Sequence, residues 1–199
     1  MKLVIVKYNA GNIRSVLFAL ERIGTEAIVT DEVDEITSAD KVIFPGVGEA
    51  STAMQYLRER NLDQVIKNLT QPVLGVCLGM QLMCAYSEEN ETTCLGIFDE
   101  PVKKFIAPEV DGTKIKVPQI GWNNLYNVKT DLFKNVAEGS YCYFVHGYYA
   151  ALGPHTIATT NYINPYSSAL QKDNFYGVQF HPEKSANTGE QIIRNFIEL

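Results

Sequence analysis

The sequence predicts an α/β fold: a single domain with a central, mostly parallel sheet flanked by helices, and a mixed or antiparallel portion in its second half. In the first half, short apolar runs alternate with amphipathic helical patterns, which is typical of a parallel sheet covered on both faces. In the second half, segments rich in β-branched and aromatic residues alternate with turn residues. No repeat or linker interrupts the 199 residues, so we expect one domain over residues 1–199.

The first half is expected to supply the parallel strands, beginning with an apolar run at residues 3–6. Gly11-Asn12 then leads into a helix whose apolar residues recur at helical spacing until Gly24. The further elements expected here are strands at residues 27–29, 42–44 and 72–76, helices at 49–60 and 62–69, and one more helix that begins at Cys77.

The second half is expected to consist mainly of antiparallel or mixed strands. The segments concerned cover residues 101–107, 115–128, 141–150, 156–163 and 168–180. A helix over 188–198 should close the chain and bury some combination of Ile192, Ile193, Phe196 and Ile197.

Charge and cysteine usage argue against several classes of protein. The net charge is −6 and the lysines and arginines are scattered, so nothing favours nucleic-acid binding. The cysteines at positions 77, 84, 94 and 142 show neither a CxxC pair nor zinc-type spacing, which indicates reduced cytosolic thiols. The apolar run before Lys7 is too short for a signal sequence or a membrane span. We therefore expect a soluble cytoplasmic protein with no metal, no cofactor and no membrane or nucleic-acid partner.

The most informative segment reads Gly-Val-Cys-Leu-Gly at residues 75–79, where a predicted strand ends and a helix begins. This is the cysteine version of the nucleophile elbow, a sharp turn that presents a reactive side chain to solvent. Gly75 and Gly79 leave room for backbone crowding that a Cβ would obstruct. The helix N-terminus beside Cys77 favours the thiolate, which is the reactive form. A buried core cysteine is the alternative, but the flanking glycines favour a nucleophile.

A thiolate nucleophile needs a base, and the sequence offers three histidines. His181 ends an apolar run and opens a His-Pro-Glu turn, so it should lie at the carboxyl edge of the sheet beside Cys77. Glu183 can face the same way and hold the imidazole tautomer. His155 follows Gly-Pro and is expected in a loop, whereas His146 ends an aromatic strand and could be satisfied in the core. We therefore predict that His181 is the base.

Attack on an amide generates an oxyanion, which needs N–H donors. One donor is the backbone N–H of Leu78, next to the nucleophile. A second is offered by Val47 in the Pro-Gly-Val-Gly turn at residues 45–48. This turn could be rigid, or its Gly46–Val47 peptide could present its carbonyl at rest and its N–H when a partner is loaded. The sequence leaves both alternatives open.

With these motifs in place, the sequence resembles the class I, or triad-type, glutamine amidotransferases over nearly its whole length. The cysteine and His-Pro-Glu motifs are typical of the class. Ile-Gly-Trp-Asn at residues 120–123 and Glu-Lys-Ser at 183–185 indicate the branch that serves imidazole glycerol phosphate synthesis in histidine biosynthesis. The segments that share in the resemblance also include residues 10–16, 44–48 and 144–149.

The resemblance implies a reaction, a set of residues and a partner. Glutamine would be hydrolysed to glutamate and ammonia through a thioester on Cys77, with Cys77, His181 and Glu183 as the triad. The positions implied to hold glutamine are Gly48, Gln81, Glu89, Gly147 and Tyr148. Gln81 lies one helical turn after Cys77, so its amide can face the same pocket. The implied partner is a (β/α)8-barrel cyclase subunit that receives the ammonia.

Two positions depart from the usual pattern of the family. Lys7-Tyr8-Asn9 stands where Asp-Tyr-Gly is common, which could alter partner contacts, and Gly147 stands where Ser is common, which keeps a main-chain contact possible. Trp122 could be a core residue or part of an interface. The alternative functions are glutaminase subunits for anthranilate, purine, pyrimidine or pyridoxal phosphate synthesis, a stand-alone cysteine amidase or peptidase, or a non-catalytic subunit.

Overall fold

The computed structural model describes residues 1–9, 12–110 and 113–199. Ala10 and Gly11, which open the motif at residues 10–16, lie outside the described residues. The helices are α1 (Ile13–Arg22), α2 (Val33–Thr37), α3 (Ala50–Glu59), α4 (Leu62–Lys67), α5 (Leu78–Met83) and α6 (Ala186–Glu198), with short 3-10 turns η1 (Glu89–Glu91), η2 (Asp131–Phe133) and η3 (Pro182–Lys184).

The strands alternate with these helices in the first half and follow one another in the second. They are β1 (Leu3–Val6), β2 (Ile28–Thr30), β3 (Lys41–Phe44), β4 (Val73–Val76), β5 (Tyr86–Ser87), β6 (Thr92–Thr93), β7 (Pro101–Lys104), β8 (Glu109–Val110), β9 (Thr113–Lys114), β10 (Gln119–Asn124), β11 (Tyr141–His146), β12 (Tyr148–Ala150), β13 (Thr156–Asn161), β14 (Pro165–Lys172) and β15 (Phe175–Val178).

Within the described ranges, one 11-stranded sheet runs in the order β2-β1-β3-β4-β15-β14-β12-β7-β5-β6, with β13 paired to β14. The five strands from β2 to β15 are mutually parallel. From β15 onward, β14, β13, β12 and β7 pair antiparallel. This arrangement confirms the predicted α/β fold with a parallel part from the first half and an antiparallel part from the second.

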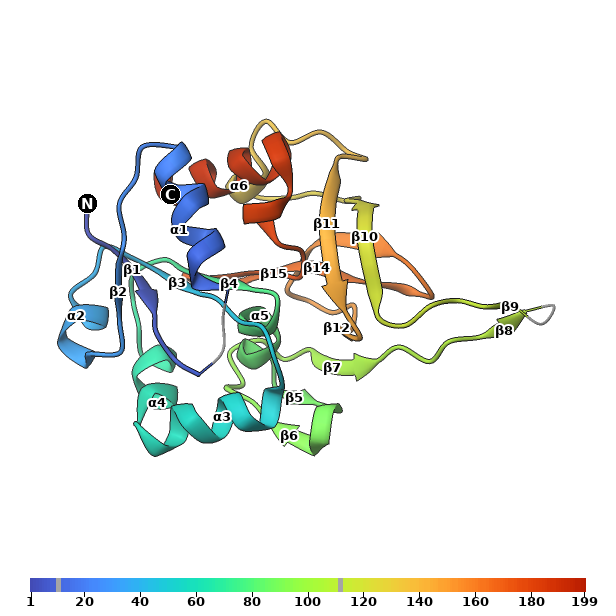
Figure 1. The fold of residues 1–199 in the computed structure, drawn as a ribbon, viewed down its shortest axis with the longest axis horizontal. Coiled ribbons are helices and arrows are strands. Elements are labelled where there is room, and N and C mark those ends of the chain that lie inside the picture. Colours follow the sequence, from blue (N-terminus) through green and yellow to red (C-terminus); the bar gives the residue numbers. More distant parts are fainter. Residues whose placement is uncertain (10–11, 111–112) are drawn as a thin grey trace.

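The parallel strands are buried on both faces because helices cover each face. Figure 1 shows α1 and α6 on one side of the sheet and α3 and α4 on the other. On β1, Val4 and Val6 belong to the core beneath α3 and α4, whereas Leu3 and Ile5 belong to the core beneath α1 and α6. This double coverage explains why these strands read as continuous apolar runs.

The parallel arrangement brings three functional segments to one edge of the sheet. β3, β4 and β15 are adjacent, so the turn at residues 45–48, Cys77 and His181 all follow their carboxyl ends. The backbone N–H of Cys77 extends the pairing by donating to the Val178 carbonyl at 2.8 Å.

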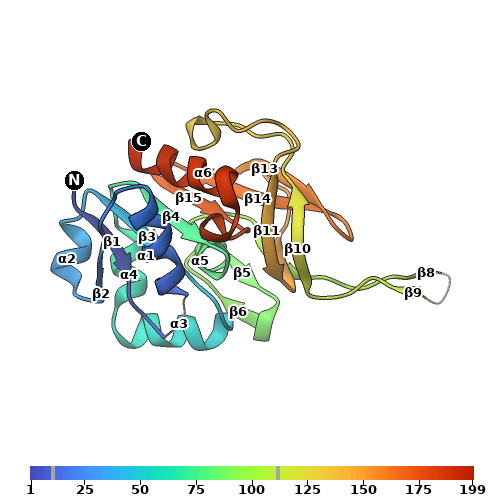
Figure 2. The ribbon, with the colours of Figure 1, turned by 45° about the horizontal axis from the view of Figure 1, so that its top comes forward.

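A separate two-stranded antiparallel ribbon, β10–β11, stands beside this edge, as Figures 1 and 2 show. Its register pairs Ile120 with Val145 and Trp122 with Tyr143. The β8–β9 hairpin, which precedes β10, extends away from the body of the molecule.

Some short elements were not expected from the sequence. Helix α2 has five residues and buries only Ile36 among them, so it lacks the two turns that would reveal a helical period. β5 and β6 have two residues each and gain their pairing from β7 and from one another. The expected segment 168–180 contains a reversal at Asp173, where φ is 51°, so its two halves pair with each other. None of the helices in the described part of the chain is both long and apolar enough to cross a membrane.

Candidate active site

Cys77 lies in the turn between β4 and α5, with backbone φ 53° and ψ −109°. Such a conformation is strained for a residue with a Cβ, so the surrounding chain must hold it. The flanking glycines allow the close approach: a Cβ on Gly79 would lie 1.9 Å from the Phe44 carbonyl oxygen, and a Cβ on Gly75 would lie 2.9 Å from the Met80 nitrogen. The structure therefore has the strand–turn–helix geometry expected for residues 75–79.

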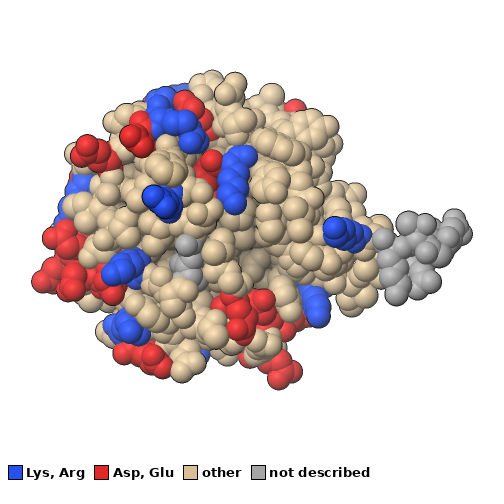
Figure 3. Space-filling view, viewed as in Figure 1, with Lys and Arg blue, Asp and Glu red and all other residues tan. Residues whose placement is uncertain are grey.

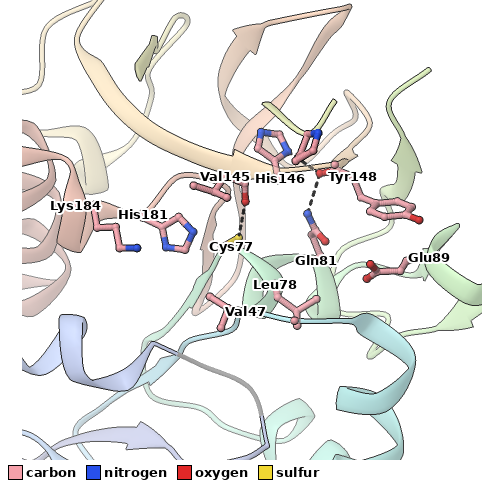
Figure 4. Close-up of a pocket in the computed structure, with 13 residues that line it drawn as sticks. Val47, Cys77, Leu78, Gln81, Glu89, Val145, His146, Tyr148, His181 and Lys184 are labelled. Atoms are coloured by element: carbon pink, nitrogen blue, oxygen red, sulfur yellow. Dashed lines mark hydrogen bonds between the residues drawn. The ribbon is translucent and has the colours of Figure 1, made fainter. Parts of the chain in front are cut away.

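The sulfur of Cys77 faces a cavity of about 470 Å³. Its thiol donates to the Val145 carbonyl at 3.8 Å, the contact dashed in Figure 4. The side-chain amide of Gln179 donates to the same sulfur at 3.7 Å. Two separate segments, β11 and the residue that follows β15, therefore contact the sulfur from different directions.

His181 follows β15, and Figure 4 shows its ring facing Cys77. Its Nδ1 lies 2.8 Å from Oε1 of Glu183. Burial would lower the pKa of His181, but hydrogen bonds with Cys77 and Glu183, together with their charges, raise it to about 10. The site therefore favours the protonated, positively charged form of His181 next to the Cys77 sulfur, an arrangement typical of a histidine paired with a cysteine nucleophile.

Glu183 lies behind His181 and away from the cavity. Its side chain is almost fully buried, and its Oε2 has no hydrogen-bond partner within the described ranges. A buried carboxylate is costly without a compensating charge, so Glu183 stabilises the protonated form of His181 more than the neutral form. This geometry orients the ring with Nε2 toward the cavity.

In the turn at residues 45–48, the Gly46 carbonyl lies where an oxyanion would need an N–H donor. The Leu78 N–H, which is the first predicted oxyanion donor, donates to the Gly46 carbonyl oxygen at 3.3 Å. This donor is therefore already engaged. Val47 and Gly48 line the cavity, and Gly48 has φ 114°, a conformation that favours glycine. The turn is thus seen in the carbonyl-facing arrangement.

Gln81 is held by a buried polar network. Its Nε2 donates to the Tyr148 carbonyl at 3.0 Å and to Oε1 of Gln179 at 2.8 Å. These two bonds use both amide hydrogens, so Oε1 of Gln81 remains as the group that can accept from a ligand. Figure 4 shows the Gln81 amide beneath Tyr148 at the cavity wall.

Each of the positions predicted to hold glutamine lines the cavity, namely Gly48, Gln81, Glu89, Gly147 and Tyr148. Oε2 of Glu89 accepts the Ala50 N–H, at the start of α3, at 2.8 Å. Burial raises the pKa of Glu89; the Ala50 hydrogen bond opposes this shift and the nearby charge of Glu49 adds to it. The carboxylate is thus fixed at the cavity rim, where it can form an ion pair with a positively charged group of a ligand.

The other two histidines have structural surroundings. His146 also lines the cavity, but its Nδ1–H donates to the Tyr148 carbonyl at 2.7 Å and its Nε2 lies 3.2 Å from the Tyr166 hydroxyl. Burial lowers the pKa of His146 to about 4, so the ring is neutral and both nitrogens are engaged. His155 lies elsewhere, beside Asp99 and Glu100.

Sequence reasoning did not assign a role to Gln179, to the Val145 carbonyl or to Lys184, although Lys184 also lines the cavity. Gln179 stands two residues before His181 on an apolar run, and a lone amide in such a run is the one sequence feature that could have indicated it. A backbone carbonyl leaves no trace in a sequence pattern. Within the described ranges, no three His, Cys, Asp or Glu side chains are grouped as metal ligands.

The chain is similar to known proteins over nearly its whole length. Residues 5–199 match the family model of glutamine amidotransferase class-I. The imidazole glycerol phosphate synthase subunit HisH of Bacteroides fragilis (strain ATCC 25285) is 57% identical over 199 residues and that of Bacteroides thetaiotaomicron is 54% identical, in both cases over 100% of each chain. The HisH subunit of Yersinia pseudotuberculosis is 44% identical over 201 residues, again covering both chains fully.

Solved structures share the fold at low sequence identity. The crystal structure of one glutamine amidotransferase has a TM-score of 0.72 at 19% identity, covering 98% of this chain and 97% of that one. A glutamine amidotransferase from Thermotoga maritima has a TM-score of 0.61 at 16% identity, covering 100% of this chain and 83% of the other.

Proposed function

The chain belongs to the class-I glutamine amidotransferase family, and we propose that it hydrolyses glutamine to glutamate and ammonia as the glutaminase subunit for imidazole glycerol phosphate synthesis in histidine biosynthesis. The observation that carries the chemistry is the meeting of Cys77 and His181 at one cavity, with Glu183 behind the imidazole. The full-length similarity to HisH subunits supports the pathway.

The first half of the reaction builds a thioester. The Cys77 thiolate attacks the side-chain amide carbon of glutamine, and a tetrahedral oxyanion forms. His181, protonated at the start, gives its proton to the leaving nitrogen, which departs as ammonia and leaves the acyl group on the sulfur. Glu183 holds the ring in place through Nδ1 and stabilises its positive charge.

The second half releases glutamate. The imidazole, now neutral, takes a proton from a water molecule, and the resulting hydroxide attacks the thioester carbonyl. Collapse of the second tetrahedral intermediate breaks the carbon–sulfur bond, and Cys77 leaves as the thiolate. The imidazolium and the thiolate with which the reaction began are thereby restored, and the raised pKa of His181 favours the protonated form of its ring.

The cavity offers matching groups for the α-amino acid end of glutamine. The acceptor Oε1 of Gln81 and the carboxylate of Glu89 suit the α-ammonium group. The main chain at Gly147 and Tyr148 lies on the same wall and can complete the recognition. A peptide substrate lacks this free ammonium, so the arrangement favours the single amino acid.

The oxyanion donors must be released before the reaction can run. If the turn at residues 45–48 were rigid, the Leu78 N–H would stay bonded to the Gly46 carbonyl. Rotation of the Gly46–Val47 peptide would free that N–H and add the Val47 N–H beside it. One oxyanion donor is worth about 10²–10³-fold in kcat, so this rotation suffices to regulate the enzyme.

We assign the outer face of the β10–β11 ribbon to the partner, a (β/α)8-barrel cyclase subunit. Ile120, Trp122 and Tyr141 are 52–57% exposed on this ribbon, and Trp122 makes an edge contact with Tyr143 at 5.9 Å between ring centroids. Figure 3 shows the area over β10 and β11 almost without charged side chains. Clustered exposed aromatic residues are typical of interfaces. Because Val145 of the same ribbon lines the cavity, ammonia released at Cys77 emerges beside this face.

The test is a reconstitution with the cyclase subunit of the same organism and its nucleotide substrate. We expect glutamine-dependent product formation and stimulated glutamate release in the complex. Cys77→Ala should abolish the glutamine-dependent reaction but leave synthesis from added ammonium salts, because the acceptor chemistry lies on the other chain. Loss of the ammonium-dependent reaction while the complex still forms would contradict this division of labour. Stimulation by the partner of another amidotransferase, and not by this cyclase, would contradict the pathway.

A further inference from the structure

Tyr8 lies just beyond the carboxyl end of β1, beneath the turn that carries the oxyanion donors. The residue is 6% exposed. Its hydroxyl donates to the Pro45 carbonyl oxygen at 2.5 Å, and its ring packs against Phe44, the last residue of β3, with 5.2 Å between ring centroids. Tyr8 therefore links the end of one parallel strand to the turn that follows its neighbour.

The hydroxyl is also in close contact with the next residue of the turn. A Cβ built on Gly46 would lie 2.5 Å from the Tyr8 hydroxyl oxygen and 2.8 Å from the Leu78 Cβ. Gly46 is the residue whose carbonyl accepts the Leu78 N–H. The phenol thus fixes the Pro45–Gly46 peptide, which immediately precedes the peptide that occupies the oxyanion position.

We propose that Tyr8 is a positioning residue for the oxyanion turn: its hydroxyl holds the turn in the arrangement that keeps the Gly46 carbonyl on the Leu78 N–H. Tyr8 neither touches the reacting atoms nor lines the cavity, so it acts through Pro45 and Gly46 alone. The inference rests on the glutaminase function proposed above and adds a group that keeps the uncoupled subunit slow.

The surroundings of Tyr8 suit a permanent donor. Burial raises the pKa of the phenol well above its ordinary value, and the nearby charge of Cys77 raises it further. The Tyr8 hydroxyl therefore keeps its proton throughout the working pH range. Because the Pro45 carbonyl oxygen can only accept a hydrogen bond, the hydroxyl is always the donor. Asn9, the neighbour of Tyr8, also bonds to α3, since its side chain donates to the Thr52 carbonyl at 3.3 Å. A partner that displaced Tyr8 and Asn9 would loosen the turn without touching Cys77.

Tyr8→Phe is the direct test because it removes one oxygen atom and keeps the ring against Phe44. We expect basal glutamine hydrolysis by the isolated subunit to rise about 3- to 10-fold, the factor that one buried hydrogen bond supplies to an equilibrium. The kcat of the complex, in which the turn is already released, should stay within about 2-fold, so the ratio of stimulated to basal kcat should fall by nearly the same 3- to 10-fold. The KM for glutamine should not change, since Tyr8 does not line the cavity.

Tyr162→Phe is the matched control. The Tyr162 hydroxyl also donates to a backbone carbonyl, that of Lys116 at 2.6 Å, which is not part of the oxyanion turn. We expect this variant to leave the ratio of stimulated to basal kcat unchanged. If Tyr8→Phe does not fold, as judged by thermal unfolding, Tyr8→Met removes the same hydroxyl with a flexible side chain and enters the same assay.

An unchanged ratio in a folded Tyr8 variant that still binds the cyclase subunit would overturn the inference, and so would a fall in basal hydrolysis. Either result would leave the proposed function standing as long as the wild-type subunit is stimulated by the partner. Absence of stimulated glutaminase activity in the wild type would instead refute the proposed function itself.

Discussion

His181 and Glu183 play unequal parts in the proposed triad, and their variants should differ. His181→Ala removes the proton carrier and should lower kcat for glutamine hydrolysis by about 10²–10⁴-fold. Glu183→Gln keeps a side chain beside Nδ1 and removes only the charge, so its loss should be smaller. The measurement is glutamate release at saturating glutamine in the reconstituted complex. A large loss in His146→Gln, with His181→Ala nearly silent, would show that the base has been misassigned.

His146 predicts a dependence of stability on pH. Its folded pKa of about 4 lies below the ordinary 6.5, so the unfolded chain binds this proton first and stability falls as pH drops from 6.5 toward 4. Below both pKa values the shift corresponds to a loss of about 3 kcal/mol in the free energy of unfolding, of which about 2 kcal/mol falls between pH 7 and pH 4.5. Urea denaturation of wild type and His146→Gln at pH 7 and pH 4.5 measures it. We expect the variant to lose less stability on acidification, and equal losses would contradict the buried neutral assignment.

The residues that carry the proposed chemistry could be inferred from the sequence because their motifs are local. Cys77 stands between two glycines, and Glu183 stands two residues from His181. Gln179 could not be found in this way, because its partners Cys77 and Gln81 lie about a hundred residues away in the chain and meet it only in the folded sheet. Roles that depend on such contacts require the structure.

Among the elements, the strand–turn–helix unit β4–α5 depends on glycine at one position more than at others. A Cβ on Gly79 would lie only 1.9 Å from the Phe44 carbonyl oxygen, so Gly79→Ala should lower the free energy of unfolding by roughly 1–3 kcal/mol or more and displace Cys77. Gly147→Ala is the control, because its Cβ would meet nothing closer than Pro118 at 3.8 Å. Thermal stability should fall in the first variant alone, whereas glutaminase activity is compared with wild type for Gly79→Ala only, because Gly147 itself lines the cavity.

Gly46 is packed more tightly than its turn motif predicts. The sequence suggests that Gly46→Ala would narrow the backbone angles of the turn and leave everything else in place. The structure shows that the new Cβ would lie 2.5 Å from the Tyr8 hydroxyl and 2.7 Å from the Gly79 nitrogen. Gly46→Ala would therefore disturb packing as well as rotation, and Tyr8→Phe tests the turn more cleanly.

The alternation of strands and helices in the first half was visible in the sequence because parallel strands buried on two faces leave continuous apolar runs. The helix α2 and the strands β5 and β6 were missed because elements of two to five residues are stabilised by their neighbours and not by their own pattern. The sequence also could not show that β15 joins the parallel strands while β14 beside it runs antiparallel.

For the whole molecule, the assignment of the β10–β11 face predicts that partner binding depends on Trp122. Trp122→Ala should raise the dissociation constant of the complex with the cyclase by about 10- to 100-fold, as loss of a central aromatic contact does at interfaces. Stability should change little, since the side chain is 52% exposed. Ile28→Ala is the control: it is an exposed apolar residue on β2, at the opposite end of the molecule in Figure 1. Equal affinity of Trp122→Ala and wild type, measured by titration calorimetry, would place the partner elsewhere.

Strand β11 is bonded to both halves of the catalytic pair. Its Val145 carbonyl accepts a hydrogen bond from the Cys77 thiol, and its Tyr143 carbonyl accepts one from the backbone N–H of His181 at 2.9 Å. The backbone N–H of Tyr143 donates to Oγ of Ser185 at 2.9 Å. The outward side chains of this strand form the face assigned to the partner. A change on that face therefore cannot be selected for binding alone, because each shift of the strand also moves the nucleophile and the base. Through evolution the two subunits would then have to change together along this strand, and a cyclase from a distant organism should bind this chain more readily than it activates it.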